Sequence, residues 1–254
     1  MANLRATLIL GGFLSLTFLL MPIQFLLLFC SSKLAQILPW YYHRILVRLL
    51  GVTIDIEGDV PNAPALIVSN HASWLDIPIL SSVMPLSFIA KREVAGWPLF
   101  GWLAKLQQSV FINRENRIST GQSARVIKAR FQIGDSFVLF PEGTSGDGKS
   151  VRTFKSSFFG VVDGLDVPVI PITLAYYSNY GLPLTEKQRP NFAWYGDMDL
   201  APHLWAALKM GPIVVKITIH APLPQKSRKQ MASIAESVVR KGLAEALHGR
   251  PEIR

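Results

Sequence analysis

The sequence predicts an α/β domain, with a central sheet flanked by helices, behind an N-terminal hydrophobic segment that anchors it in a membrane. Three observations predict this arrangement. An uncharged apolar run lies near the N-terminus, short apolar strands alternate with helical stretches after residue 51, and the composition is both apolar and basic. We therefore divide the chain into an anchor with an interfacial helix at residues 1–50 and a second domain at residues 51–254.

The composition favours a membrane partner. Half of the 254 residues are hydrophobic, and 26 Lys and Arg against 17 Asp and Glu give a net charge of +9. A basic chain favours an anionic partner, and the apolar excess favours a membrane surface over nucleic acid, for which the sequence has no recognition motif. The single cysteine, Cys30, excludes an internal disulfide, and no Cys/His cluster is present for a structural metal. We expect no metal and no cofactor.

The N-terminal apolar run predicts a membrane-anchoring helix. Residues Leu8–Phe29 carry no charge, and about 20 apolar residues are enough to cross a bilayer. Pro22 and Gln24 interrupt the run, so a kinked or re-entrant helix is an alternative to a straight crossing. A cleaved signal peptide is a further alternative, although no small-residue cleavage site follows promptly.

A second helix is predicted directly after the anchor, at Lys33–Gly51. Trp40, Tyr41 and Tyr42 suit the headgroup level of a bilayer, and basic residues lie beside an apolar face. This pattern favours a helix that lies in the membrane interface, while the alternative is an ordinary amphipathic helix packed on the domain. More positive charge follows the anchor than precedes it, which places the bulk of the chain in the cytoplasm.

Short apolar stretches predict the strands of the sheet. Val52–Ile56 alternates apolar and polar residues, as a half-buried strand does, and Ala65–Ser69 is an apolar run bounded by Pro64 and Asn70. The other predicted strands are Ser87–Ala90, Val110–Ile112, Phe137–Phe140, Val167–Leu174 and Ile213–Ile219.

Helices are predicted between these strands, which is the alternation expected of an α/β domain. Gly121–Ile133 has an amphipathic pattern and is followed by Gly134, a common residue just past a helix end. The polar stretch Tyr180–Asp199 predicts a surface excursion. The other predicted helices are Ile77–Met84, Trp97–Leu106 and Lys229–Ala246.

One stretch of the sequence points towards nucleotide binding. Gly143–Ser150, with the sequence GTSGDGKS, fits the phosphate-loop pattern of spaced glycines followed by lysine and serine after a strand. Pro141 and Glu142 intervene between the strand and the first glycine, and Glu142 with Asp147 would repel a triphosphate. We interpret this match as accidental, with a nucleotide-dependent membrane enzyme as the hypothesis that it leaves open.

The best candidate for chemistry follows the second predicted strand. His71 and Asp76 lie five residues apart in the segment NHASWLD, at a strand end of the kind where α/β domains place their sites. A histidine takes a proton from a hydroxyl near neutral pH, and a carboxylate on its other ring nitrogen holds the correct tautomer. The alternative is a helix cap at Asn70 or Ser73 beside a structural histidine.

Four sequence blocks together resemble the glycerolipid acyltransferases, typified by lysophosphatidate acyltransferase. In chain order they are Asn70–Asp76 (NHASWLD), Val110–Arg114 (VFINR), Phe140–Thr144 (FPEGT) and Val167–Ile172 (VPVIPI). The resemblance covers about residues 50 to 220, and the hydrophobic N-terminal anchor also fits it. It implies a mixed central sheet flanked by helices, and an acyl transfer from an acyl thioester to the hydroxyl of a lyso-lipid.

The resemblance also implies roles for individual residues. His71 is the general base, and Asp76 orients it. Arg114 contacts the acceptor headgroup or a donor phosphate, whereas Glu142 and Gly143 position the acceptor or stabilise the reacting centre. The substrate-binding residues that the blocks imply are Asn70, Ser73, Arg114, Glu142, Gly143 and Thr144, and Lys91, in FIAKRE, matches a basic position often seen in the family.

The third block departs from the family pattern at one position. Lysophosphatidate acyltransferases usually continue it as FPEGTR, whereas Ser145 stands here in place of the arginine. Arginine suits phosphate because it offers paired N–H donors, so its absence argues against a phosphate-bearing acceptor. The continuation resembles bacterial acyltransferases that act on lyso-ornithine lipid and related aminolipids. Lys149, Arg152 and Lys155 are candidates to bind an acidic headgroup, the acceptor's carboxylate or a donor phosphopantetheine. The alternative is that these three residues form only a solvated basic face.

The resemblance thus predicts an enzyme of the bacterial inner membrane with its catalytic domain on the cytoplasmic face. Its predicted partners are the lipid bilayer, a lyso-lipid acceptor, and acyl carrier protein or acyl-CoA as donor, with no nucleic acid. The favoured acceptor is a lyso-aminolipid such as lyso-ornithine lipid, and the alternative is 1-acyl-sn-glycerol-3-phosphate (lysophosphatidate). A non-catalytic lipid-binding protein on the same scaffold is the hypothesis from another class, against which the intact His71 and Asp76 argue.

We expect direct transfer without a covalent acyl-enzyme, with backbone donors near Gly143 holding the developing oxyanion. The acyl chain needs a dry tunnel. The residues predicted to line this tunnel are Phe88, Trp97, Phe100 and Trp102. The alternative for each of them is ordinary packing in the core.

Overall fold

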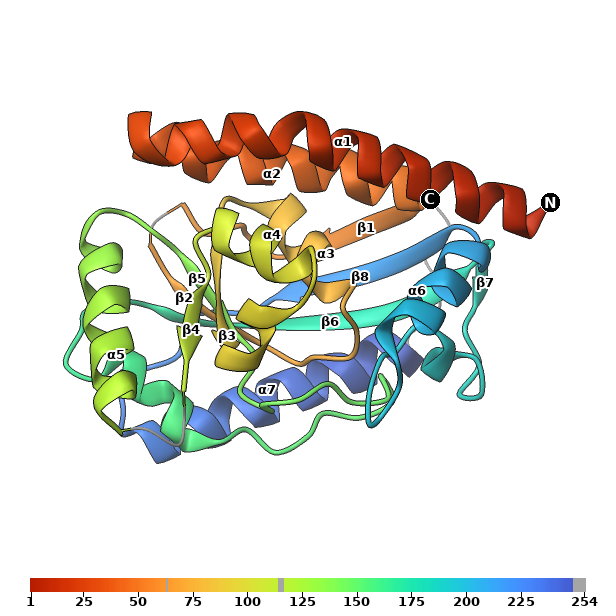
Figure 1. Cartoon of the computed structure of the whole chain (residues 1–254). Coiled ribbons are helices and arrows are strands. Elements are labelled where there is room, and N and C mark those ends of the chain that lie inside the picture. The colour runs from red at the N-terminus through yellow and green to blue at the C-terminus, as the bar shows by residue number, and fades with distance from the viewer. Residues whose placement is uncertain (63, 114–116, 249–254) are drawn as a thin grey trace.

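A sheet lies at the centre of the protein, with helices on both of its faces (Figure 1). The computed structural model describes residues 1–62, 64–113 and 117–248. Within these residues the sheet has eight strands, in the order β1-β8-β6-β2-β5-β3-β4, with β7 paired to β6. The strands are β1 (Val52–Glu57), β2 (Leu66–Ser69), β3 (Ser87–Lys91), β4 (Val110–Ile112), β5 (Phe137–Leu139), β6 (Val169–Asn179), β7 (Leu182–Pro183) and β8 (Ile213–Ile219).

The sheet is mixed, which confirms the predicted fold class. Strand β8 runs parallel to β1 but antiparallel to β6. The pairs β2–β5, β2–β6, β3–β5 and β3–β4 are all parallel. The carboxyl ends of β2, β3, β5 and β6 therefore meet at one edge, which is where an α/β sheet offers a site.

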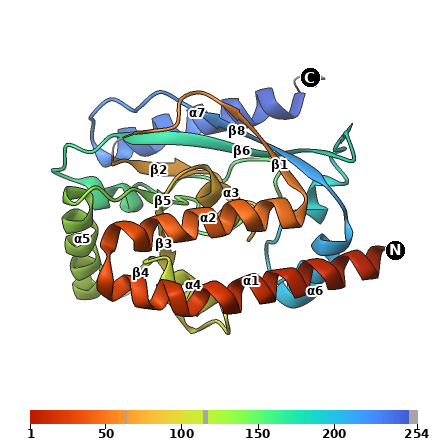
Figure 2. The same ribbon diagram turned by 90° about the horizontal axis from the view of Figure 1, so that it is seen from above.

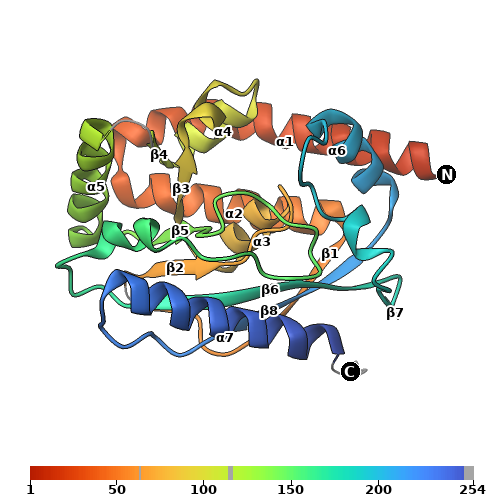
Figure 3. The same cartoon turned by 90° about the horizontal axis from the view of Figure 1, so that it is seen from below.

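Helices cover both faces, and each face has its own apolar core. The helices are α1 (Ala2–Cys30), α2 (Ser32–Leu50), α3 (Asp76–Val83), α4 (Phe100–Leu106), α5 (Arg117–Gln132), α6 (Leu200–Lys209) and α7 (Arg228–His248). Figures 2 and 3 show α1 and α2 side by side across one face and α7 across the other. Because successive strand residues point to opposite faces, Ile67 packs with α1 and α2 while Leu66 and Val68 pack with α7.

Most of the predicted elements are present within a few residues of their expected bounds. Two helices differ. The helix predicted at Trp97–Leu106 begins only at Phe100, because a 3-10 helix, η1 (Arg92–Gly96), and a left-handed Leu99 (φ 57°) precede it. Helix α6 was not predicted, although Leu200, Leu204 and Leu208 follow one another at the four-residue spacing of a helix face.

The prediction that Tyr180–Asp199 is a surface excursion is wrong for its second half. After the short 3-10 helix η3 (Arg189–Asn191), Phe192 and Ala193 are buried, and the ring of Phe192 stacks against Tyr176 of β6. The segment was mistaken for a loop because its prolines and charges obscure the two consecutive buried residues, Phe192 and Ala193. It covers part of the carboxyl-end edge of the sheet.

Helix α1 carries apolar side chains on its outer side and polar side chains on its inner side, which is the reverse of a helix in a soluble protein. It is long and apolar enough to cross a bilayer, it continues through Pro22 without a break, and its outer side carries exposed side chains such as Phe18 and Leu26. The polar Thr17 and Gln24 instead point inward and are 1% and 5% exposed. This inversion is expected of a helix whose outer surface contacts lipid.

Helix α2 packs on the domain rather than lying free at the membrane surface. Tyr42 is buried and shares a 2.8 Å hydrogen bond with Thr17 of α1, and the indole N–H of Trp40 donates to the carbonyl of Ser82 at 2.9 Å. The predicted headgroup position is therefore wrong for Trp40 and Tyr42, whereas Tyr41 is exposed. The alternative interpretation, an amphipathic helix packed on the domain, describes α2 better.

The Gln24 side chain links α1 to α2 by donating a hydrogen bond that Pro39 cannot donate. Pro39 has no N–H, so the carbonyl of Ala35, four residues earlier in α2, lacks its helical donor. The Gln24 side-chain amide donates to that carbonyl at 2.7 Å and to the carbonyl of Leu106, at the end of α4, at 2.8 Å. The polar residue Gln24 within the apolar run of α1 is thus explained by a buried contact.

Replacing Gln24 tests this contact. In Gln24→Leu the carbonyls of Ala35 and Leu106 lose their side-chain donor, so we expect the free energy of unfolding to fall by about 1–3 kcal/mol. Chemical unfolding of the detergent-solubilised protein would measure it. Leu26→Gln, at an exposed position two residues away, is the matched control and should leave unfolding unchanged. Equal effects of the two variants would contradict the assignment.

Candidate active site

Asn70 directly follows strand β2 and is the first residue of the candidate site. Its side-chain amide donates to the carbonyl of Leu174 at 2.8 Å, and its side-chain oxygen accepts from the Leu174 N–H at 2.9 Å. These bonds continue the β2–β6 pairing for one more step through a side chain. Asn70 is buried, so it supports the site from behind, and the structure does not bring it to a substrate surface.

The next residues bring His71 and Asp76 together. Nδ1 of His71 lies 2.7 Å from Oδ2 of Asp76, the first residue of α3. The N–H groups of Ala72 and Ser73 donate to the same oxygen at 2.7 and 2.9 Å. Because the segment turns back on the carboxylate in this way, a spacing of five residues is enough to place the histidine against the aspartate. The side chain of Ser73 is fully buried in this turn.

The pairing decides which nitrogen of His71 is available for chemistry. Ionised Asp76 only accepts hydrogen bonds, so Nδ1 carries the proton and Nε2 has a free lone pair. The ring stacks on Phe140 with its centroid 4.0 Å away and is partly exposed on the wall of a cavity. Within the described residues nothing bonds to Nε2, which suits it to accept a proton from a bound group.

Tyr176 of β6 completes the surroundings of Asp76. Its buried hydroxyl donates to Oδ1 of Asp76 at 2.6 Å, on the oxygen that His71 does not use. The sequence analysis missed this residue. The available signal was strand periodicity, since Ile172, Leu174 and Tyr176 alternate along β6 and so share one face of the sheet.

Glu142 holds the backbone of the histidine segment. Its Oε1 accepts the His71 N–H at 3.0 Å, and its Oε2 accepts the Arg152 N–H at 3.2 Å. The Gly146 N–H donates to the His71 carbonyl at 2.8 Å, so both backbone groups of His71 are tied to the loop after β5. Glu142 is 3% exposed, and its position is that of a support for His71 rather than of a surface group.

Gly143, Thr144 and Ser145 line the cavity beside His71. Gly143 adopts a left-handed conformation (φ 76°) that glycine favours, and its N–H donates to the Phe140 carbonyl at 3.0 Å. Thr144 is exposed at the cavity wall. The Ser145 hydroxyl donates to the carbonyl of Trp194, whose own N–H donates to the Ala72 carbonyl at 2.8 Å. The segment around Trp194, which the sequence did not single out, therefore closes over the histidine loop.

The predicted basic residues fall into separate places. Lys91 is exposed and lies on the cavity wall at the end of β3. Lys149, Arg152 and Lys155 are exposed on the loop that follows β5, outside the cavity wall. Arg114 lies outside the described residues.

The same loop decides the phosphate-loop question. A phosphate loop runs directly into the N-terminus of a helix, where N–H groups cradle the phosphates. Here the chain from Phe140 to Lys155 contains no helix, and the next element is the 3-10 helix η2 (Ser156–Val162). The interpretation of Gly143–Ser150 as an accidental match agrees with this geometry.

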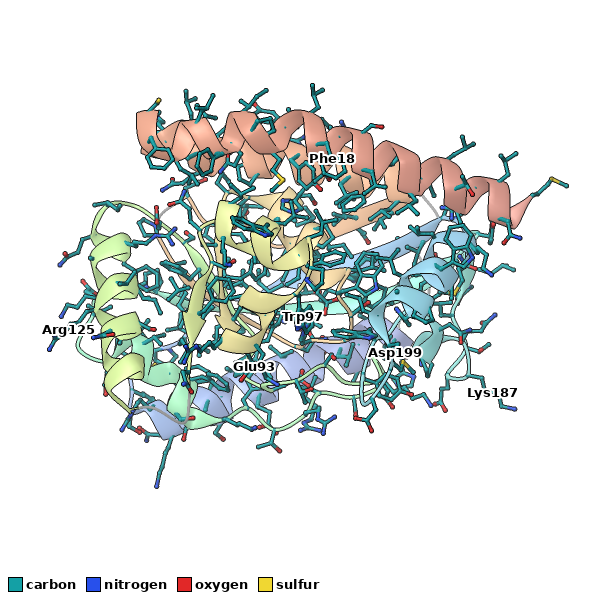
Figure 4. The ribbon with its side chains drawn as sticks, viewed as in Figure 1. Phe18, Glu93, Trp97, Arg125, Lys187 and Asp199 are labelled. Atoms are coloured by element: carbon teal, nitrogen blue, oxygen red, sulfur yellow. The ribbon has the colours of Figure 1, made fainter. Side chains whose placement is uncertain are left out.

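A large apolar cavity of about 410 Å³ opens beside His71. Phe88, Trp97 and Phe100 line it as predicted, and Figure 4 labels Trp97 just ahead of α4. Trp102 does not line it. That side chain is 57% exposed and lines an outer groove between α1 and α4 instead, so its prediction as a wall of the cavity is wrong.

The comparisons with known proteins agree with this site. A family model described as Acyltransferase matches residues 51–175. The lyso-ornithine lipid O-acyltransferase of Brucella abortus (strain 2308) is 38% identical, over 98% of this chain and 97% of its own length. The chain belongs to the acyltransferase family. The resemblance found in the four sequence blocks is thereby confirmed.

Two further proteins bear on the acyltransferase. The 1-acyl-sn-glycerol-3-phosphate acyltransferase of Neisseria gonorrhoeae is 31% identical over 66% of this chain and 64% of its own. The crystal structure of the 1-acyl-sn-glycerophosphate acyltransferase of Thermotoga maritima superposes with a TM-score of 0.69, covering 99% of this chain and 100% of that one. At 22% identity this second likeness shows the fold alone.

Tyr176 can be tested as a positioning residue for the acyltransferase reaction. In Tyr176→Phe, Asp76 loses the donor on Oδ1, and the aspartate is less firmly held against His71. We expect kcat to fall roughly tenfold with KM nearly unchanged, because only a step after binding is affected. Tyr177→Phe, which removes a hydroxyl from the next residue on the strand, is the matched control. A raised KM with normal kcat in Tyr176→Phe would refute the positioning role.

Glu142 predicts a pH dependence of stability. Burial raises its pKa from 4.5 to about 8, against the lowering effect of the His71 and Arg152 N–H groups. The folded state thus binds the proton more tightly than the unfolded state does. The stabilising contribution is complete below about pH 4.5 and is lost as the pH rises through about 8.

We therefore expect the melting temperature of the wild type to fall between about pH 5 and about pH 8.5 more steeply than that of Glu142→Gln, which cannot titrate. Melting curves of both proteins at several pH values would measure this difference. If the difference between the two melting temperatures is constant over the whole pH range, Glu142 is not the titrating group.

Proposed function

We propose that this acyltransferase moves a fatty acyl chain from an acyl thioester to the hydroxyl of lyso-ornithine lipid or a closely related lyso-aminolipid. The observation that carries the proposal is the similarity to the Brucella abortus lyso-ornithine lipid O-acyltransferase, which extends over nearly the whole of both chains. Lysophosphatidate is the second candidate acceptor, because the Neisseria gonorrhoeae relative is similar over a shorter part of each chain.

The His71–Asp76 pair supports a direct transfer. Nε2 of His71 takes the proton of the acceptor hydroxyl while that oxygen attacks the thioester carbonyl carbon, forming the new C–O bond. The C–S bond then breaks, and the imidazolium returns the proton to the leaving sulfur, which departs as a thiol. Asp76 stays ionised throughout and stabilises the imidazolium through Nδ1–H. No acyl-enzyme is needed.

The developing oxyanion needs N–H donors at the cavity wall. The Gly143 N–H is already used by the Phe140 carbonyl, so this amide is not free for the role that the sequence analysis expected. The amide of Thr144, on the cavity wall and without an acceptor among the described residues, takes this role in our proposal.

The neighbourhood of Ser145 supports an acceptor without a phosphate. At this position the loop carries a hydroxyl that is used by the Trp194 carbonyl, and it offers no cation to a headgroup. The nearest basic side chains of the same loop are Lys149 and Arg152, both exposed beyond the cavity wall.

The donor is a phosphopantetheine thioester of acyl carrier protein or of coenzyme A. Lys91 offers a positive charge at the cavity wall for its phosphate. Both donors are cytoplasmic, so we place the catalytic domain on the cytoplasmic face of a bacterial inner membrane. The exposed apolar side of α1 supports the attachment, and because α1 lies along the domain, the cavity beneath it is held next to the bilayer.

An acyl-transfer assay tests the proposed function. Membranes containing the protein would receive acyl-carrier-protein thioester and, in separate reactions, lyso-ornithine lipid or lysophosphatidate. We expect acylation of lyso-ornithine lipid at a rate at least tenfold above that of lysophosphatidate. His71→Ala should abolish transfer, while the protein stays folded and membrane-bound.

The outcomes of this assay separate the possibilities. Acylation of lysophosphatidate alone would replace the proposed acceptor by the second candidate. Retention of most activity by His71→Ala would overturn the mechanism. A normal melting curve and normal sedimentation with membranes are needed from His71→Ala, since they distinguish lost chemistry from lost folding.

A further inference from the structure

The cavity extends from His71 in two directions beneath α1. On one side, which we call the α4 arm, it is lined by Leu20, Met21 and Gln24 of α1 with Phe100, Leu103 and Leu106 of α4. On the other, the α6 arm, it is lined by Ile9, Leu10 and Phe13 of α1 with Leu200, Leu204 and Leu208 of α6. Figure 3 shows α4 and α6 as separate helices beneath different parts of α1.

His71 lies between the two arms. Its ring stacks on the ring of Phe140. The ring centroids of Phe140 and Phe88 are 6.1 Å apart, and Phe88 belongs to β3, the strand that leads to α4. On the other side, the indole N–H of Trp74 donates to His203 of α6 at 3.1 Å. Ile9 and Gln24 are fifteen residues apart on α1, which is roughly 22 Å at a rise of about 1.5 Å per residue. The cavity is therefore elongated, with the reactive nitrogen between its two ends.

The two arms end differently. The α4 arm adjoins an apolar groove on the outside of the protein, between α1 and α4, and Met21 and Leu106 line both the groove and the cavity. The outer walls of this groove are the exposed Phe18, Phe25 and Trp102. At the end of the α6 arm, the Arg5 guanidinium instead donates to the carbonyls of Leu50 and Leu208 and fastens α1 to α2 and α6.

Transfer of an acyl chain from a thioester to a lyso-lipid requires an apolar place for two chains, the donor's acyl chain and the acceptor's tail. The lyso-lipid acceptor lives in the bilayer with one tail, whereas the donor chain arrives on a water-soluble thioester. A tail can pass from the bilayer into the groove without crossing water, because the groove lies on the lipid-facing side of α1 and its walls are apolar. The fastened end of the α6 arm offers no comparable path.

We propose that the acceptor's own tail enters through the groove between α1 and α4 and lies in the α4 arm, while the donor's acyl chain lies in the α6 arm. The hydroxyl of the acceptor and the carbonyl of the donor then meet at His71 from opposite sides. This inference rests on the proposed transfer to a lyso-lipid hydroxyl, and it deepens it by assigning a separate subsite to each chain.

Two matched substitutions and one control substitution test the assignment. Leu103→Trp fills the α4 arm, Leu204→Trp fills the α6 arm, and Ile133→Trp, at an exposed position in the turn just after α5, is the control. Each variant would be assayed with acceptors of increasing tail length at one donor, and with donor thioesters of increasing chain length at one acceptor. Whichever lyso-lipid the wild type acylates serves as acceptor.

We expect Leu103→Trp to lower kcat/KM for the longest acceptor tails by roughly tenfold or more, while the donor series is unchanged. Leu204→Trp should do the reverse, and Ile133→Trp should change neither series. Exchanged effects, or two variants that both change the donor series alone, would overturn the assignment. Melting temperatures within a few degrees of the wild type are required of all three variants.

Failure of this inference can be told apart from failure of the proposed function. The proposed function is tested by whether the wild type transfers an acyl chain to a lyso-lipid at all. The inference is tested only by how the two length series change in the variants. A third variant, Met21→Trp, narrows the junction of groove and cavity, and it should raise the KM of a long-tailed acceptor in vesicles while that of the donor stays constant. An unchanged acceptor KM would contradict entry through the groove.

Discussion

The buried carboxylate of Asp76 depends on the donors that surround it, and the rest of the site depends on Asp76. An ionised side chain with no solvent exposure is unfavourable unless its oxygens are satisfied. Among the described residues four groups donate to it, namely the backbone N–H groups of Ala72 and Ser73, the Tyr176 hydroxyl and His71 Nδ1. Its place in the first turn of α3 adds the favourable end of the helix dipole. The position and tautomer of His71 follow from this arrangement.

A second set of contacts keeps the histidine segment from moving away from Asp76. Glu142 and Gly146 bind the two backbone groups of His71. The Ser145 hydroxyl donates to the Trp194 carbonyl, and the Trp194 N–H donates to the Ala72 carbonyl. Three segments far apart in the chain are thus tied together at the carboxyl ends of β2 and β5. Rigid support of this kind is what a general base needs, because proton transfer is sensitive to small displacements.

The first two helices are part of the domain's core, and α1 also carries an exposed apolar surface. Buried residues of α1 and α2 belong to the same apolar cluster as the sheet residues Ile67 and Val215. Thr17 and Gln24, which interrupt an apolar run, make the buried hydrogen bonds, and the apolar side chains point outward. Helix α1, whose exposed apolar side suggests membrane association, therefore also covers the cavity beside His71.

The sequence by itself determined the elements that depend on local pattern. Strand periodicity predicted the sheet, and the uncharged run predicted α1. The segment NHASWLD predicted the His71–Asp76 pair, because the two residues are only five positions apart and meet within one turn. Only the tertiary structure decided the partners that come from elsewhere. Tyr176 is 100 residues from Asp76, and the contact of Ser145 with Trp194 joins two loops.

Orientation was also decided only in three dimensions. Trp40 and Tyr42 have the composition of a membrane belt, yet they point inward because Ser82 and Thr17 offer them buried hydrogen-bond partners. Glu142 belongs to a recognisable block, but its carboxylate binds backbone rather than facing a substrate. A sequence pattern tells which residues can carry charge, donate or pack. The direction in which each side chain points depends on contacts between distant segments, which no local pattern contains.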